Sequence, residues 1–116
     1  MDKLKVVFHI DEMTKWKLTL GNVSNLLAAL EDQSITIEVV ANAEAVLAYV
    51  NKPNNAENLD KMDTLIQRKV LFVACNNALI AFQIDPISLF TKIQIVKAGV
   101  EELVIRQHEG YAYIKP

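Results

Sequence analysis

Residues 69–82 read KVLFVACNNALIAF, and this stretch passes directly from a strand pattern into a helical one. Positions 69–74 form a short apolar run of the kind that favours a buried strand. The next residues, NNALIAFQ at 76–83, predict a short helix. A strand that is apolar on both faces is typical of a parallel sheet covered by helices on both sides. The stretch therefore favours an α/β fold.

Other segments of the chain repeat the strand pattern. Apolar runs at 4–10, 35–40 and 93–96 each predict a strand, and YAYI at 111–114 predicts a last one. With 69–74 they make about five strands. Their order in the sheet is left open, because apolar patterns do not specify which strands are neighbours.

Helical patterns lie between these runs. We expect helices within 11–32, at 59–68 and at 98–110, where Gly110 is well suited to stop the last helix. The expected apolar face of that last helix consists of Val100, Leu103, Val104 and Gln107. Strands that alternate with helices predict one domain over 1–116, a three-layer α/β/α sandwich with a mostly parallel, flavodoxin-like sheet.

Several local features carry expectations of their own. Trp16 fits the apolar stripe of the first helix and should pack in the core. Asp11 and Glu12 precede that helix and should cap it, while Gly21 within it suggests a close packing point. The polar stretch NKPNNAEN at 51–58 is expected to be a surface loop.

Composition limits the classes of function. The chain has 116 residues, 52% hydrophobic and 22% charged, with a net charge of −2, which suits a globular domain without a nucleic-acid or membrane partner. One cysteine allows no internal disulfide. We find no signal-peptide pattern and no apolar run long enough to span a bilayer. A reducing, cytoplasmic setting is expected.

Candidate site residues follow from the predicted sheet. In an open α/β sheet, ligands bind beyond the carboxyl ends of the strands. Polar or reactive residues at the four expected strand ends are His9, Asn42, Cys75, Asn76, Asn77 and Lys97.

Cys75 supports two interpretations. It ends a strand and enters a helix, and helix N-termini stabilise anions, so its thiolate could be a nucleophile. Free cysteine also often behaves as a small buried hydrophobe, and Val73, Ala74 and Ala78 around it suit that role. Spacing alone leaves both interpretations open.

The other candidates also have a structural alternative. His9 can be a hydrogen-bonded core histidine or the base of a cysteine-dependent enzyme. Asn76 and Asn77 can orient a ligand or make turn hydrogen bonds. Lys97 can hold an anion near the thiol or remain solvated at the surface.

Known motifs for cofactors and metals are absent from the sequence. It contains neither GxGxxG nor a P-loop, so no phosphate cradle is expected. The two histidines, His9 and His108, show no metal-ligand spacing. We therefore expect no metal and no organic cofactor.

Six motifs together resemble the DsrE/DsrF-like family, most closely its uncharacterised single-domain members. They are KVVFHIDE at 5–12, NLLAAL at 25–30, IEVVAN at 37–42, FVACNNAL at 72–79, KAGVEELV at 97–104 and EGYAYIKP at 109–116. The resemblance runs almost end to end, except for about 51–68.

The resemblance implies a function. Family members with assigned roles take part in sulfur relay, in which a cysteine at the end of a central strand carries a persulfide between partner proteins. The matching position here is Cys75. The resemblance also implies a homo-oligomer, a trimer or hexamer, with sulfur-donor and acceptor proteins as partners. A carrier needs one cysteine, because the second thiol belongs to the donor or acceptor.

Two other functions remain as alternatives. A non-catalytic binding or assembly module would use the same strand ends with Cys75 as packing. A cysteine-dependent enzyme would need His9 as its base.

Overall fold

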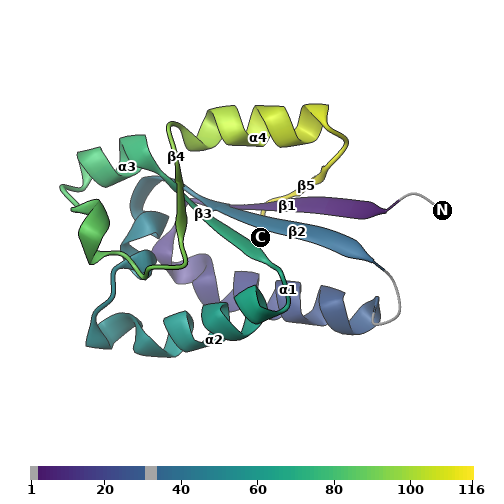
Figure 1. Cartoon of the computed structure of the whole chain (residues 1–116), viewed down its shortest axis with the longest axis horizontal. Coiled ribbons are helices and arrows are strands. Elements are labelled where there is room, and N and C mark those ends of the chain that lie inside the picture. The colour runs from purple at the N-terminus through teal and green to yellow at the C-terminus, as the bar shows by residue number, and fades with distance from the viewer. Residues whose placement is uncertain (1–2, 31–33) are drawn as a thin grey trace.

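Five strands form one parallel sheet in the computed structural model of the protein, which describes residues 3–30 and 34–116. The strands are β1 (Leu4–Ile10), β2 (Ile35–Ala41), β3 (Leu71–Cys75), β4 (Gln94–Val96) and β5 (Ala112–Ile114). Their order across the sheet is β4-β3-β2-β1-β5 (Figure 1). The predicted α/β class and the predicted parallel sheet are confirmed.

Helices cover both faces of the sheet. The α-helices are α1 (Trp16–Ala29), α2 (Ala56–Gln67), α3 (Asn76–Ala81) and α4 (Gly99–His108). Short 3-10 helices lie at Met13–Lys15, Ala43–Tyr49, Pro53–Asn55 and Pro86–Ser88. Figure 1 shows α1 and α2 below the sheet and α4 above it. The final residues of the predicted first helix, 31 and 32, lie outside the described residues.

The larger apolar core lies between the sheet and the α1–α2 layer. Trp16 is 1% exposed there, as predicted. Its indole N–H donates to the carbonyl of Ala45 over 3.0 Å, and its ring meets that of Tyr49 edge-on, with centroids 5.3 Å apart. A buried indole needs such a partner, because an unpaired N–H in an apolar core is costly.

The face beneath α4 holds a smaller core. Of the predicted apolar face of this helix, Leu103 is confirmed as buried, but the two valines are wrong. Val100 and Val104 are 63% and 65% exposed, whereas Leu103 and Glu102 are buried. A hydrophobic pattern assumes that the helix packs on apolar residues alone, but the sheet below carries a buried acid, Glu38. The helix therefore turns a charged side toward the sheet and its valines toward solvent.

The end of α4 agrees with the prediction. Gly110 follows the helix with φ +95°, a conformation that glycine adopts most easily. The N–H of Tyr111 bonds to the carbonyl of Arg106, and that of Gly110 bonds to Gln107, as in a Schellman motif. This turn sends the chain into β5.

Two expectations for the first helix are wrong. Gly21 has nothing within 4 Å of the position of a β-carbon, so it marks no close contact. Glu12 occupies the cap position of the first 3-10 helix but makes no side-chain capping bond. Asp11 instead forms an ion pair with Lys115 over 3.4 Å, so its charge holds the C-terminal segment and does not cap the helix.

The segment 51–58 is not the loop that its polarity predicts. It contains a 3-10 helix, Pro53–Asn55, and the start of α2. Asn55 is 5% exposed, and its amide donates to the carbonyls of Leu47 and Val50 over 2.9 and 2.8 Å. Most of the segment is exposed, as predicted, but the polarity of Asn55 reflects buried hydrogen bonding.

Replacing Asn55 by alanine should lower the free energy of unfolding by about 1–3 kcal/mol, because two carbonyls lose their donor. Urea denaturation measures the loss. The neighbouring Asn54 is exposed, so Asn54→Ala is a matched control that should change stability by less than about 0.5 kcal/mol. Equal effects of the two variants would contradict this role of Asn55.

Candidate functional site

Cys75 lies where the connections of two neighbouring strands leave the sheet toward opposite faces. The chain after β3 enters α3, whose Ala78 and Leu79 join the core on the α1–α2 side. The chain after β4 enters α4, whose Leu103 joins the core on the other side. Such a switch between neighbouring strands is where ligands bind in open α/β sheets. Cys75 ends β3 at this point, paired in register with Val96.

The thiol of Cys75 is enclosed by the beginnings of two helices. The side chain is 6% exposed, and the residue caps α3 with an extended backbone. A β-carbon on Gly99, the first residue of α4, would lie 3.2 Å from the β-carbons of both Cys75 and Asn42. Glycine at 99 therefore lets α4 begin directly over the thiol. Free N–H groups of both first turns favour an anion there.

A chain of hydrogen bonds reaches the same place from the far edge of the sheet. The hydroxyl of Tyr113 lies 2.6 Å from Nδ1 of His9, and Nε2 of His9 lies 3.0 Å from Oδ1 of Asn42. The rings of Tyr113 and His9 are 5.7 Å apart. Asn42 in turn shares the contact with Gly99 described above. Three predicted residues, His9, Asn42 and Cys75, are thus neighbours.

Tyr113 was missed by sequence reasoning. It belongs to the predicted last strand, but its role depends on β5 lying beside β1, where Tyr113 is paired with Val7. Strand order was not available from apolar patterns. The available signal was a tyrosine within a predicted strand, since the hydroxyl of a tyrosine usually has a hydrogen-bond partner when its ring packs.

The bonding of His9 decides between its two interpretations. It is hydrogen-bonded, as the structural interpretation expects, but it is half-buried rather than in the core. Both ring nitrogens face Tyr113 and Asn42, so neither is directed at Cys75. The geometry thus gives no support to a Cys–His hydrolase.

The remaining predicted residues stay at the margin of the site. Asn76 is half-buried and Asn77 exposed in the first turn of α3, and neither side chain bonds to any residue that the structure describes. Lys97 is exposed and forms no ion pair within the described part of the chain. These positions can contribute backbone N–H groups, but their side chains do not converge on Cys75.

A second polar cluster lies under the other half of α4. Glu38 of β2 is 1% exposed, and its Oε1 accepts from Nε of Arg106 over 3.0 Å. The same Nε lies 3.0 Å from Glu102, and the other end of the guanidinium bonds to Glu109 over 2.9 Å. Sequence reasoning missed this cluster, although a lone acid in the apolar run 35–40 was a visible signal.

The cluster holds a proton at neutral pH. Burial raises the pKa of Glu38 to about 8, and the nearby carboxylate of Glu102 acts in the same direction. The pKa of Glu102 is lowered, first by its hydrogen bond with Glu38. Oε2 of Glu38 is buried and accepts from no donor among the described residues, so this oxygen is free to carry the proton. A protonated Glu38 relieves the repulsion between the two carboxyl groups.

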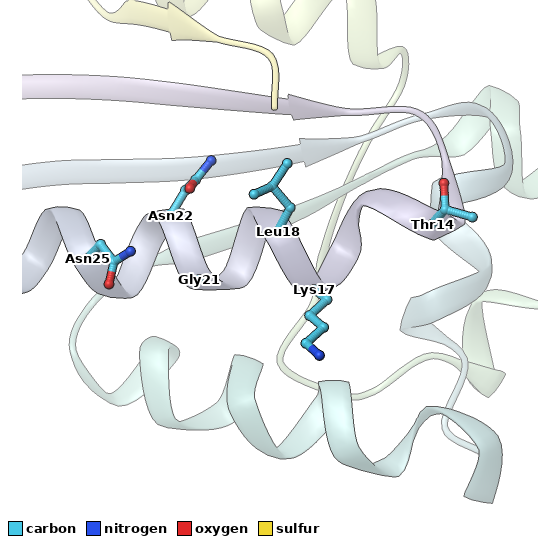
Figure 2. Close-up of a pocket in the computed structure, with 6 residues that line it drawn as sticks. All are labelled: Thr14, Lys17, Leu18, Gly21, Asn22 and Asn25. Atoms are coloured by element: carbon cyan, nitrogen blue, oxygen red, sulfur yellow. The ribbon is translucent and has the colours of Figure 1, made fainter.

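A surface groove lies away from Cys75. It has a volume of about 490 Å³ and follows successive turns of α1 (Figure 2). Its lining residues are Thr14, Lys17, Leu18, Gly21, Asn22 and Asn25. None of them is a candidate site residue. In residues 3–30 and 34–116, no cluster of three acidic, histidine or cysteine side chains could hold a metal, and no helix could cross a membrane.

Comparison with known proteins agrees with this arrangement. The model of the DsrE/DsrF-like family matches residues 5–116. A protein of unknown function, MTH1491 from Methanobacterium thermoautotrophicum, is 37% identical over 98% of this chain and 100% of its own, with a TM-score of 0.87. The ychN protein of E. coli shares the fold, at 16% identity and a TM-score of 0.67 over the full length of both chains. None of the curated proteins matches significantly.

Proposed function

The chain belongs to the DsrE/DsrF-like family, and on this premise we propose that it is a sulfur carrier that accepts and passes on sulfur as a persulfide at Cys75. The family is generally associated with sulfur relay. The observation that carries the proposal is the position of Cys75, at the end of a central strand and at the switch point of the sheet. This is the position at which the family carries its cysteine.

The proposed reaction is an exchange at sulfur. The Cys75 thiolate attacks the outer sulfur of a donor persulfide, R–S–SH. A bond forms between Sγ and that sulfur while the S–S bond of the donor breaks, and the electron pair leaves with the donor as R–S⁻. Cys75–S–SH results without net oxidation or reduction. An acceptor thiolate removes the sulfur by the same exchange, so the single cysteine of the chain suffices.

The surroundings of Cys75 support this chemistry electrostatically. The thiol lies against the first turns of α3 and α4, whose N–H groups lack intrahelical acceptors. Backbone N–H groups after Cys75 would stabilise the sulfur anion, with Asn76 and Asn77 as local hydrogen-bonding residues. Asn42, directly after the neighbouring strand β2, supplies an amide. No metal or organic cofactor has a part in the exchange.

The proposed carrier works as a homo-oligomer, a trimer or hexamer, with separate sulfur-donor and acceptor proteins. The exposed side of α4 supports an interface between copies, since Val100, Val104 and Ile105 are 63%, 65% and 43% exposed. The proposed compartment is the cytoplasm, because a lone thiol persists there in reduced form. Neither a nucleic acid nor a membrane is a proposed partner.

One observation favours the alternative, an assembly or small-ligand-binding module with Cys75 as packing. The side chain is 6% exposed and belongs to the larger apolar cluster. Sulfur transfer requires a donor to reach this thiol past the first turn of α4. Thiol reactivity in the folded protein therefore separates the two functions.

The deciding experiment incubates folded wild type and Cys75→Ser with inorganic polysulfide and measures the intact mass. A gain of one or two sulfur atoms in wild type alone is expected. Wild type alkylated while unfolded and then refolded is a second control, because its thiol is blocked. If wild type gains no sulfur and its thiol reacts with iodoacetamide only after unfolding, Cys75 is a core residue and the carrier function is wrong.

A further inference from the structure

We infer that Tyr113 is a positioning residue for Cys75: acting through His9, it fixes the side-chain amide of Asn42 so that its N–H groups are available to sulfur on Cys75. The inference rests on the proposed function for its chemical consequence. The chain of hydrogen bonds itself joins a residue of β5, a residue of β1 and Asn42 directly after β2, and it can be tested without any sulfur transfer.

The direction of each hydrogen bond follows from the groups involved. Oδ1 of Asn42 can only accept, so Nε2 of His9 must carry the proton in the bond that joins them. A neutral imidazole has one N–H, so Nδ1 is then an acceptor. The Tyr113 hydroxyl must therefore donate to Nδ1. Tyr113 thus selects the Nε2–H tautomer, which in turn binds the oxygen end of the amide.

Fixing the oxygen of Asn42 leaves its NH₂ group as a free donor on the side away from His9. The β-carbons of Asn42 and Cys75 both lie 3.2 Å from the β-carbon position of Gly99. Residue 99 adds no side chain there, and the remaining neighbour of that position, Cγ1 of Val40 at 3.5 Å, is apolar. The amide of Asn42, directly after β2, is therefore a side-chain donor close to Cys75. A donated N–H stabilises sulfur more as its negative charge increases.

Tyr113 is held in place by the C-terminal segment. Strand β5 has three residues and pairs with β1, where Val7 is opposite Tyr113. Beyond it, Lys115 pairs with Asp11 at 3.4 Å. Tyr113 is 41% exposed, so its burial contributes little to the core and its hydroxyl is its main contact. The C-terminal strand thereby determines the geometry of a site on the opposite half of the sheet.

The test compares Tyr113→Phe with Tyr111→Phe. The first removes the hydroxyl and keeps the ring on His9. The second removes the hydroxyl of a tyrosine two positions away, whose ring lies near Lys5 and Arg106 instead. Two measurements are made on each variant. The first is the NMR resonances of the His9 ring nitrogens and of the Asn42 side-chain amide. The second is the rate of sulfur loading from polysulfide.

The expected result is specific to Tyr113. Wild type should show His9 as the Nε2–H tautomer, and Tyr113→Phe should convert it to a tautomer mixture and shift the Asn42 amide. Cys75→Ser should shift the same amide. Sulfur loading should slow by about three- to tenfold in Tyr113→Phe, the effect of one lost hydrogen bond, and stay unchanged in Tyr111→Phe.

The outcomes separate this inference from the proposed function. The inference is overturned if wild type shows the Nδ1–H tautomer of His9. It is also overturned if the side-chain amide resonance of Asn42 shifts in neither Tyr113→Phe nor Cys75→Ser. Shifted resonances with an unchanged loading rate also overturn it, since the bonds would then be structural only. If wild type does not load sulfur, the proposed function fails, and the resonances alone decide whether Tyr113 positions Asn42 at the thiol.

Discussion

Arg106→Ala should lower the free energy of unfolding by about 2–4 kcal/mol, because the buried carboxyl group of Glu38 loses its charged hydrogen-bond donor and Glu102 loses its cation. Glu38 is 1% exposed and cannot turn to solvent, and Glu102 lies on the same guanidinium nitrogen. The two carboxyl groups would then face each other without a positive charge. Urea denaturation at constant pH measures the change.

Two further variants make this expectation specific. Arg68 is an exposed arginine at the end of α2, so Arg68→Ala should change stability by less than about 0.5 kcal/mol. Glu38→Leu combined with Arg106→Leu should be more stable than Arg106→Ala alone, because an apolar pair needs no compensating charge. A loss below about 1 kcal/mol in Arg106→Ala would show that the cluster does not hold α4 to the sheet.

The cluster also links stability to the proposed site. α4 buries Leu103 as its apolar anchor and otherwise depends on Glu102 and Arg106 to meet the sheet. Its first residue, Gly99, covers Cys75. A helix held by few apolar contacts opens locally at lower cost than one in the main core. Weakening the cluster should therefore raise the alkylation rate of Cys75 in the folded protein.

The sequence patterns predicted what depends on local periodicity. Short, mainly apolar runs identified all five strands. For β1, β2 and β3 the reason is that a strand buried on both faces has few polar positions. The rule for carboxyl ends then brought His9, Asn42 and Cys75 into one list, and the structure makes them neighbours. These successes need only the alternation of elements and the direction of the strands.

The failures come from pairings between distant segments. Val100 and Val104 satisfy a helical pattern, but which face of α4 is buried depends on Glu38, far away in the chain. Tyr113 reaches His9 because β5 pairs with β1, and strand order is not encoded in any single run. The sequence predicts that Asn55 lies in a loop, because its two carbonyl partners, Leu47 and Val50, are seen only in the structure.

The stability of the protein should fall as the pH rises from about 4.5 to about 8, because the folded state keeps a proton on Glu38 that the unfolded chain releases. The pKa of Glu38 is raised from 4.5 to about 8, chiefly by burial. Its contribution is fully present below 4.5 and is lost as the pH passes through about 8. The slope approaches about 1.4 kcal/mol per pH unit within the window, up to a total of about 5 kcal/mol.

Glu102 acts in the opposite direction at lower pH. Its pKa is lowered, so its contribution is present above 4.5 and is lost as the pH falls below that value. The two carboxyl groups together favour maximal stability in weakly acidic solution. Urea denaturation at a series of pH values should locate this maximum.

Glu38→Gln isolates the effect, because an amide resembles the protonated acid and does not titrate. This variant should lose most of the decline between about 4.5 and about 8, whereas the exposed Glu44→Gln should keep it. Both histidines are present in all three proteins, so the difference from wild type belongs to residue 38. If Glu38→Gln shows the same decline as wild type, the buried carboxyl group is ionised at neutral pH. Arg106 would then neutralise Glu38 without a shared proton, and α4 would remain docked across the whole range.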